Sequence, residues 1–434
     1  MGNLISKAAI KKRFKSSLQR GTGEAYQIML KNRRVDFSTD LIRASLVNYA
    51  YHQQMEGSRG WYLAKLMALS DNKARIRKAI LDALATERKN RHSLSQLFDL
   101  ACIFAKKGDR QSRIVMYNRF GKKIISGDQW CGAGSILLLD GFEGLKFITT
   151  TIGKFLEKNP DETEDDGLIV HFQTDNPAID VQAELIKESA HNKDIKIYLD
   201  RIKQNEEDWQ NYQRPVYNYD TIKEQLMDRR RSYISSSYAK SLSRKEIKQV
   251  ADALLVEPDR FKKGKYLSIF YDIKFPYPYQ PLLQMAQSNL NAQKEVVKWA
   301  VEALRLFAGR DIRHFAVEKL SSTKAPWIYL PLLIKNYRPG DSVLLTKIAE
   351  HHVKEENVHN LAVDFIKIYK TNQTTECLAP LWVLYDKLTC GVCRKRVVEI
   401  LIETDIIPDK ILREIKYDSY WETRQLAMKL SKRK

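Results

Sequence analysis

The chain has 434 residues, of which 44% are hydrophobic and 29% charged, so it has enough apolar side chains for a large core. Its 18 glycines and 12 prolines are few, which excludes fibrous and low-complexity classes and disfavours a turn-rich β protein. The formal net charge of +20 favours partners of negative charge.

The positive charge is concentrated at the two ends of the sequence. Residues 1–130 carry a formal net charge of +16 and residues 216–434 carry +12, whereas residues 131–215 carry −8. A long segment of one sign attracts polyanions and speeds their capture. The uneven charge therefore favours a nucleic acid or an acidic protein as partner. The alternative is a protein–protein scaffold whose charge is incidental.

The first residues match the pattern for N-terminal myristoylation, with Gly2 as the acceptor and Ser6 at the required position. Lys11, Lys12 and Arg13 follow, and a basic cluster is the second signal that a single acyl chain needs for stable membrane binding. A lipid-anchored peripheral protein is therefore one alternative, with a membrane surface as partner only if Gly2 is acylated. The other interpretation is an ordinary basic first helix.

The cellular setting follows from what the sequence lacks. No run approaches ~18 uncharged apolar residues, so no transmembrane segment is predicted. Five cysteines are few and odd in number, which does not suit the disulfide framework of a secreted protein. These observations favour a reducing, cytoplasmic location.

Helical patterns dominate the N-terminal part. Apolar residues recur every three or four positions over 62–70, 76–84 and 94–105, which is the spacing of amphipathic helices. Residues 1–155 are therefore predicted to form an N-terminal basic helical region.

The middle of the sequence, residues 156–280, has a different pattern. An acidic run occupies 161–166, and 168–172 could be a short strand or a buried connector. Tyrosines and arginines are then frequent up to about residue 240. We expect an irregular region that begins acidic and becomes rich in Tyr and Arg.

The C-terminal part, residues 281–434, returns to short, regular helices. The three prolines Pro276, Pro278 and Pro281 end the preceding structure. Four further helices are predicted after this break, over 294–308, 312–320, 358–369 and 378–388. Short helices with brief connections stack into bundles or solenoids.

One spacing recurs through these helices. It consists of an Arg, a small or apolar residue three positions later, and a Leu four positions after that. It occurs at Arg77, Arg313 and Arg394, and Arg424 begins a near match. The segment Asp311–Leu320 resembles the second helix of a HEAT-type repeat, in which an Asp near the turn and an Arg on the following helix bracket the stacked core. The resemblance covers about 290–434 and more thinly about 22–155. It implies an all-α, HEAT-like α-solenoid of antiparallel helix pairs.

Motifs for catalysis or metal binding are incomplete. The segment Gly132–Ser135 lacks the third Gly of a dinucleotide fingerprint and the Lys of a phosphate loop, so a turn or a close helix contact is predicted there. Cys390 and Cys393 form a CxxC between two helices. The residues that could in principle complete a zinc site are Cys377, His351, His352 and His359, but their spacing fits no standard motif. We therefore predict no catalytic residue, no metal site and no cofactor.

Clusters of cations are the best-supported functional feature, because phosphate contact needs several of them on one surface. The candidate polyanion-binding residues are Lys11, Lys12, Arg13, Arg33, Arg34, Arg75, Arg77, Lys78, Arg229, Arg230, Arg231, Arg394, Lys395 and Arg396. The leading hypothesis is a non-catalytic α-solenoid interaction protein that uses a basic face to bind nucleic acid or an acidic partner. An enzyme is a further alternative, because HEAT-like folds include alkylpurine DNA glycosylases. That family's Trp-Asp pattern is not found here, and the present chain is longer.

Overall fold

The computed structural model describes residues 6–122, 129–210 and 217–431. Every regular element in these ranges is a helix and none is a strand, which confirms the all-α class. The chain divides into two compact units. Unit 1 comprises Met1–Gln213 with Leu412–Lys434, and unit 2 comprises Arg214–Ile411.

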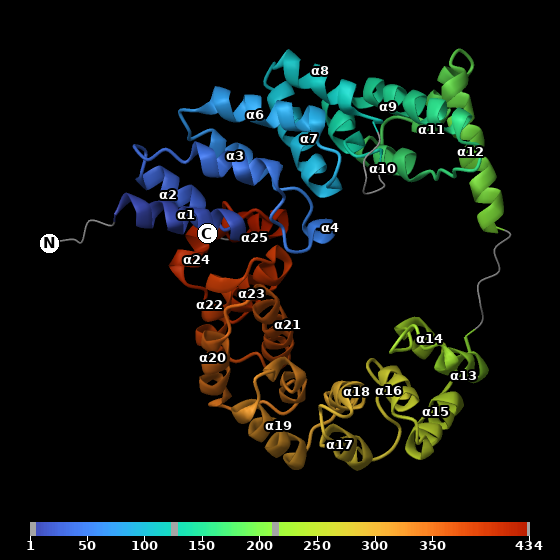
Figure 1. Ribbon diagram of the computed structural model, residues 1–434, viewed down its shortest axis with the longest axis vertical. Helices are drawn as coiled ribbons and strands as arrows, with labels where there is room; N and C mark the ends of the chain where they lie inside the picture. The colour runs from blue at the N-terminus through green and yellow to red at the C-terminus, as the bar shows by residue number, and fades with distance from the viewer. Residues whose placement is uncertain (1–5, 123–128, 211–216, 432–434) are drawn as a thin grey trace. The chain divides into compact units, whose positions relative to one another are not determined.

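This division differs from the three predicted regions. The helix α9 runs past residue 155 to Lys158 and packs against α12 (Lys193–Gln210), so the acidic segment belongs to unit 1. The helices of unit 1 (Figure 1) are α1 (Lys7–Arg20), α2 (Glu24–Lys31), α3 (Ser38–Leu46), α4 (Gln53–Glu56), α5 (Gly60–Met67), α6 (Lys73–Thr86), α7 (Arg91–Ala105), α8 (Arg110–Arg119), α9 (Ala133–Lys158), α10 (Gly167–Asp175), α11 (Val181–Ser189), α12 and α25 (Trp421–Ser431).

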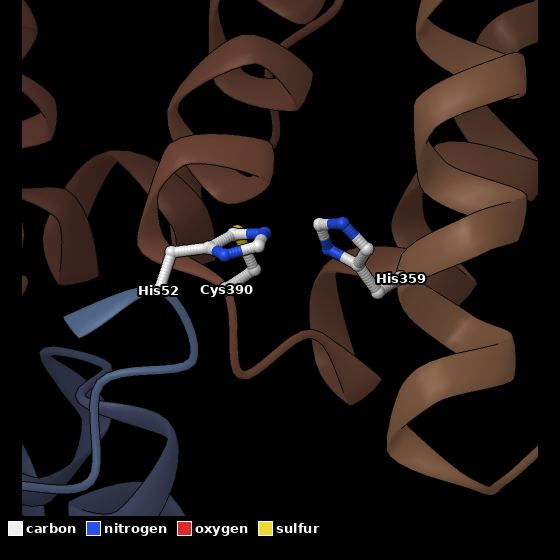
Figure 2. Close-up of side chains that lie close together, drawn as sticks. All are labelled: His52, His359 and Cys390. Carbon is white, nitrogen blue, oxygen red and sulfur yellow. The ribbon is translucent and has the colours of Figure 1, made fainter. Parts of the chain in front are cut away.

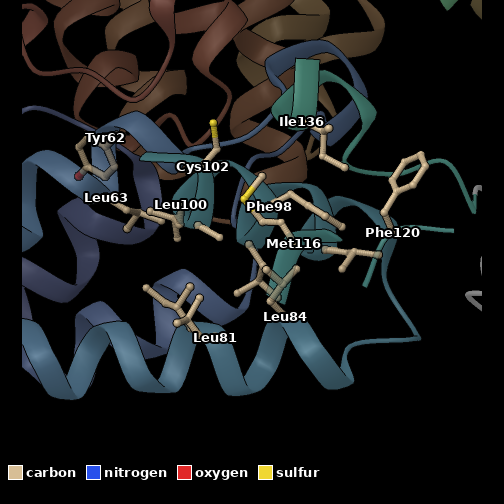
Figure 3. Packing of buried hydrophobic residues seen from close by; sticks show 14 of the residues in the cluster. Tyr62, Leu63, Leu81, Leu84, Phe98, Leu100, Cys102, Met116, Phe120 and Ile136 are labelled. Carbon is tan, nitrogen blue, oxygen red and sulfur yellow. The ribbon is translucent and has the colours of Figure 1, made fainter. Parts of the chain in front are cut away.

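The core of unit 1 is built around α7, which packs against α3, α5, α6, α8 and α9. Leu97, Phe98 and Leu100 of α7 are fully buried. Figure 3 shows Phe98 and Leu100 among the buried hydrophobic side chains. The buried side chain of Gln96 also donates hydrogen bonds of 2.9 Å to the carbonyl oxygens of Ala44 and Ser45 in the last turn of α3. The helices predicted from periodicity over 62–70, 76–84 and 94–105 are confirmed as α5, α6 and α7.

Two glycines of unit 1 allow helices to approach closely. Gly132, which precedes α9, has a φ of 100°, and a Cβ there would lie 2.6 Å from the ring of Phe98. Of the segment predicted as a turn or a close helix contact, Gly132 lies in a turn, and Ala133 to Ser135 begin α9. On α9, a Cβ at Gly153 would lie 1.9 Å from the carbonyl oxygen of Asp194 on α12, so only glycine fits this crossing.

The first and last segments of the chain lie side by side within unit 1. The backbone N–H of Ser419 donates to the carbonyl oxygen of Gly21 at 2.7 Å. The rings of Tyr26 and Tyr417 stack with centroids 3.9 Å apart. Residues separated by almost the whole sequence thus share one unit.

The central acidic segment is more regular than expected. The prediction of a strand or connector over 168–172 is wrong, because this stretch lies inside α10. Asp165 accepts a hydrogen bond from the backbone N–H of Gly167 at 2.9 Å, and Ile169 and Phe172 bury one face of the helix. Ile169 and Phe172 have the three-residue spacing of a helix face. This spacing is hard to recognise in the sequence because the residues after Gly167 are consecutively apolar.

Unit 2 is built from helices that pack against their neighbours along the chain. They are α13 (Tyr219–Met227), α14 (Ser236–Ser241), α15 (Arg244–Val256), α16 (Arg260–Ile269), α17 (Gln280–Ala286), α18 (Lys294–Leu304), α19 (Arg310–Ser322), α20 (Asp341–His351), α21 (Glu355–Asn372), α22 (Leu378–Lys387) and α23 (Gly391–Glu403). The 3₁₀ helices are η1 (Pro326–Ile328), η2 (Leu330–Leu333) and η3 (Thr375–Cys377), and α24 (Asp409–Ile415) crosses the unit boundary. The α18 helix packs against α16, α17 and η2, while α21 packs against η2, α22 and α23. The helices and the proline break predicted after residue 275 are confirmed.

Lysines and arginines bind the carbonyl groups where helices end. The last carbonyls of a helix have no partner inside it and form the negative end of its dipole. Lys265 is fully buried, and its ammonium group donates to the carbonyl oxygens of Gln225, at 2.7 Å, and Asp228. Equivalent contacts to carbonyls in or just beyond a last turn are made by Arg59, Arg119, Arg201, Arg305, Lys387 and Arg394.

Replacing Lys265 with Met should lower the free energy of unfolding by about 2–4 kcal/mol, because two buried carbonyl groups lose their donor. Lys263→Met is the control, since Lys263 lies half-buried on the same helix and its side chain has no polar partner among the described residues. That change should cost less than about 0.5 kcal/mol. Denaturant unfolding measures both, and equal losses would contradict the proposed role.

A carboxyl group of unit 2 is buried. Asp364 on α21 is 7% exposed, and burial raises its pKa to about 7. The ammonium group of Lys367 lies 3.5 Å away and opposes this shift, while the nearby Glu302 adds to it. The folded state therefore holds a proton between pH ~4 and ~7 that the unfolded chain has already released.

Because of that proton, Asp364 should make stability fall as pH rises from about 4 to 7. Asp364→Asn should remove the decline and raise the free energy of unfolding at pH 8, relative to wild type, by about 2–4 kcal/mol. Glu356→Gln, at an exposed position on the same helix, is the control. Unfolding curves at pH 5 and pH 8 test this, and parallel pH profiles for wild type and Asp364→Asn would exclude it.

Candidate nucleic-acid interface

Three turns of unit 1 bring cations to a common edge. Arg33 and Arg34, between α2 and α3, line a polar pocket of about 120 Å³ with the turn that precedes α6. Lys73 is the first residue of α6, and it lines a second pocket with Lys107 from the turn after α7. We call Arg33, Arg34, Lys73 and Lys107 the basic edge.

The side chains of the basic edge are exposed, and none of the four forms an ion pair or a hydrogen bond with the residues that the structure describes. The neighbouring carboxylate of Asp36 is already occupied. Asp36 accepts hydrogen bonds from the backbone of Ser38, at 2.8 Å, and from the amide of Asn72, at 3.1 Å. Asp71, which is exposed, also lies on this edge.

The second pocket combines apolar and charged lining residues. It has a volume of about 280 Å³, and its apolar lining residues are Ala64, Met67, Ala68, Ala74 and Phe104. Its charged lining residues are Lys73, Lys107 and the ion pair of Arg77 with Asp109. Cations beside an apolar surface suit a ligand with both phosphate groups and planar bases.

Arg77 and Asp109 hold this pocket together. The guanidinium of Arg77, on α6, makes two hydrogen bonds to the carboxylate of Asp109, one of them 2.6 Å long, where α8 begins. These bonds hold the pKa of Asp109 at about 2. Unit 2 contains the same arrangement, because Arg313 on α19 binds Asp341 at the start of α20 through hydrogen bonds of 2.6 and 2.8 Å.

Several predicted cations have internal partners. Arg13 pairs with Glu24, and Lys78 pairs with Asp82 at 2.6 Å. Arg230 pairs with Asp228 at 2.9 Å, and Lys395 pairs with Glu399 at 2.7 Å. The predicted residues with exposed side chains and no ion pair among the described residues are Lys12, Arg33, Arg34, Arg75, Arg229, Arg231 and Arg396. Lys11 is half-buried.

The prediction for Arg394 is corrected by the structure. Its side chain is fully buried, and its guanidinium donates to the carbonyl oxygens of Leu388, at 3.2 Å, and Thr389, at 2.8 Å. A group so enclosed cannot contact a polyanion in the folded chain. The cluster over 394–396 therefore does not act as a unit, because consecutive residues of a helix point in different directions.

Sequence reasoning misses Lys73 and Lys107. Lys73 is an isolated lysine at the start of a helix, and Lys107 follows a single other lysine after a helix end. Neither therefore stands out in the sequence as part of a cluster. The available signal is their position, since both lie beside the turns that flank α6 and α7. Cations from separate turns form one surface only when the helices stack.

The lipidation hypothesis concerns Gly2, which lies outside the described residues. Among the residues that are described, no helix is both long enough and apolar enough to cross a membrane. Comparison of the chain with protein-family models, with curated proteins and with solved structures gives no match.

Structural and available cations should respond differently to mutation. Arg77→Gln should lower the free energy of unfolding by about 1 kcal/mol, because Asp109 loses its two hydrogen bonds. Lys73→Gln should change it by less than about 0.5 kcal/mol, since its exposed side chain has no ion pair among the described residues. Denaturant unfolding of the two variants tests this, and a larger loss for Lys73→Gln would contradict the assignment.

Proposed function

We propose that unit 1 binds nucleic acid through the basic edge, and that the protein is an interaction protein without catalytic activity of its own. The observation that carries the proposal is the set of Arg33, Arg34, Lys73 and Lys107. These exposed cations have no ion pair among the described residues, and two of them, Lys73 and Lys107, border an apolar pocket. Such cations release counterions from phosphates on binding.

We further propose a HEAT-like organisation of the helices, which would suit this function. In both units, an Arg of the sequence repeat reaches an Asp at the start of a later helix: Arg77 reaches Asp109, and Arg313 reaches Asp341. Stacked repeats of this kind place successive turns along one edge. Such an edge offers charges at regular intervals to an extended ligand, and a nucleic-acid backbone is a ligand of that shape.

Nucleic acid fits the edge better than an acidic protein does. Phe104 and Met67 line the pocket between Lys73 and Lys107, so an unstacked base has an apolar surface beside its phosphates. An acidic peptide would use the cations and leave these apolar side chains uncovered. The proposal therefore favours single-stranded over double-stranded nucleic acid.

The glycosylase alternative receives less support from the same pocket. Such an enzyme would use an Asp in an aromatic-lined groove, and Asp109 lies near Phe104. Both carboxylate oxygens of Asp109 are already engaged, one by Arg77 and the other by Arg77 and Ser112. A carboxylate held in this way is poorly placed to activate water.

The test is binding of labelled single- and double-stranded DNA and RNA over a series of salt concentrations. We expect affinity for single strands to fall steeply with salt, with a slope of about −0.7 per phosphate contacted. Arg34→Gln/Lys73→Gln/Lys107→Gln should weaken binding at least about tenfold at low salt and reduce the slope by about 2.

The matched control is Lys158→Gln/Lys196→Gln/Lys203→Gln, which removes the same charge from exposed positions of unit 1 that have no ion pair among the described residues. It should bind nearly as well as wild type. Equal weakening by both variants would mean that net charge, and not the basic edge, governs binding. Binding of polyglutamate without binding of any nucleic acid would assign the edge to an acidic protein.

A further inference from the structure

Two cysteines begin a helix of unit 2. Cys390 is the residue that caps α23, and Cys393 lies in its first turn. The backbone N–H of Cys393 donates to the sulfur of Cys390 at 3.4 Å. A helix N-terminus and an N–H···S bond both favour the thiolate form, which is the form that binds metal.

A histidine from another helix meets this pair. His359, on α21, has its Nδ1 atom 3.6 Å from the sulfur of Cys393. A ring nitrogen of His359 also lies within 4.8 Å of the sulfur of Cys390, and Figure 2 shows the ring facing that residue. His52, which the figure also draws, belongs to unit 1 and is not one of these three donors.

The other candidate ligands of the sequence have different neighbours. The sulfur of Cys377 lies 3.9 Å from the hydroxyl oxygen of Thr404. His351 contacts the carbonyl oxygen of Lys347 on its own helix at 2.7 Å, and the ring of His352 packs against Trp327. His359 is thus the one of the four candidates that the fold brings to the CxxC.

We propose that Cys390, Cys393 and His359 bind one Zn²⁺ ion that joins α21 to α23. Two thiolates and one imidazole are a donor set that zinc prefers. Zinc ligands at their usual distances of about 2.3 Å for sulfur and 2.1 Å for nitrogen lie about 3.6 Å apart at the tetrahedral angle. The separation of Cys393 Sγ and His359 Nδ1 is 3.6 Å, so this pair needs little movement to bind the ion.

The ion would have a structural role that is independent of nucleic-acid binding. Cys390 and Cys393 are both buried, as ligands of structural zinc usually are. Water or a further donor completes the fourth tetrahedral position. Zinc binding would tie together two helices that already pack against each other, and it would stabilise unit 2 against unfolding.

The experiment uses the full chain, reduced and stripped of metal, titrated with Co²⁺ as a spectroscopic probe and then with competing Zn²⁺. We expect one Co²⁺ per chain, with thiolate charge-transfer absorption and the visible bands of a tetrahedral ion. Cys390→Ser, Cys393→Ser and His359→Gln should each weaken binding at least about 100-fold, since losing even an outer partner of a ligand costs about 10–100-fold.

Cys377→Ser is the control, because it removes a buried thiol of the same unit that lies apart from the CxxC. It should bind Co²⁺ as wild type does. A second readout needs no variant: Zn²⁺ should slow alkylation of Cys390 and Cys393 in the wild-type chain and leave that of Cys131 unchanged.

Three results would overturn the proposal. The first is the absence of thiolate–Co²⁺ absorption in the reduced wild-type chain, and the second is its persistence in Cys390→Ser/Cys393→Ser. The third is a chain that binds no Co²⁺ while oxidised glutathione converts Cys390 and Cys393 to a disulfide. For each protein disulfide formed, one oxidised glutathione is reduced to two molecules of glutathione thiol. Cys390 and Cys393 would then be a redox-active dithiol and not a zinc site.

Discussion

Many of this chain's cations bind carbonyl groups where helices end, and the packing of both units depends on that interaction. A protein of short helices has many helix ends, and every end leaves carbonyl groups without a partner. Lys265, Lys387 and Arg394 supply donors to such ends in unit 2. Arg59, Arg119 and Arg201 do the same in unit 1. A cation in such a place also interacts favourably with the helix dipole.

Because of this interaction, not every cation behind the net charge of +20 is available to a partner. A cation that is enclosed by carbonyl groups contributes to the fold, whereas an exposed cation without an ion pair is available to a partner. Arg394 and Lys73 illustrate the two cases, since the first is fully buried and the second lies on the basic edge. Only the available cations support a polyanion-binding function, so a count of charges overstates that support.

Local patterns predict much of this fold and little of its sites. The positions of α5, α6, α7 and α18 follow from apolar spacing, because a helix with one buried face must repeat every three or four residues. The helix over 167–175 is missed because its apolar residues are consecutive. The meeting of His359 with Cys393 is missed as well, because it joins two helices whose contact no local pattern encodes. Burial of Arg394 likewise depends on tertiary packing.

The most direct test of the central claim is to cross-link bound single-stranded RNA to the wild-type chain with ultraviolet light and to map the attached peptides by mass spectrometry. The proposal predicts cross-links in the peptides that contain Arg33 and Arg34, the start of α6, and Phe104 with Lys107. Cross-links confined to other surfaces, such as the peptide of Arg229–Arg231, would contradict it.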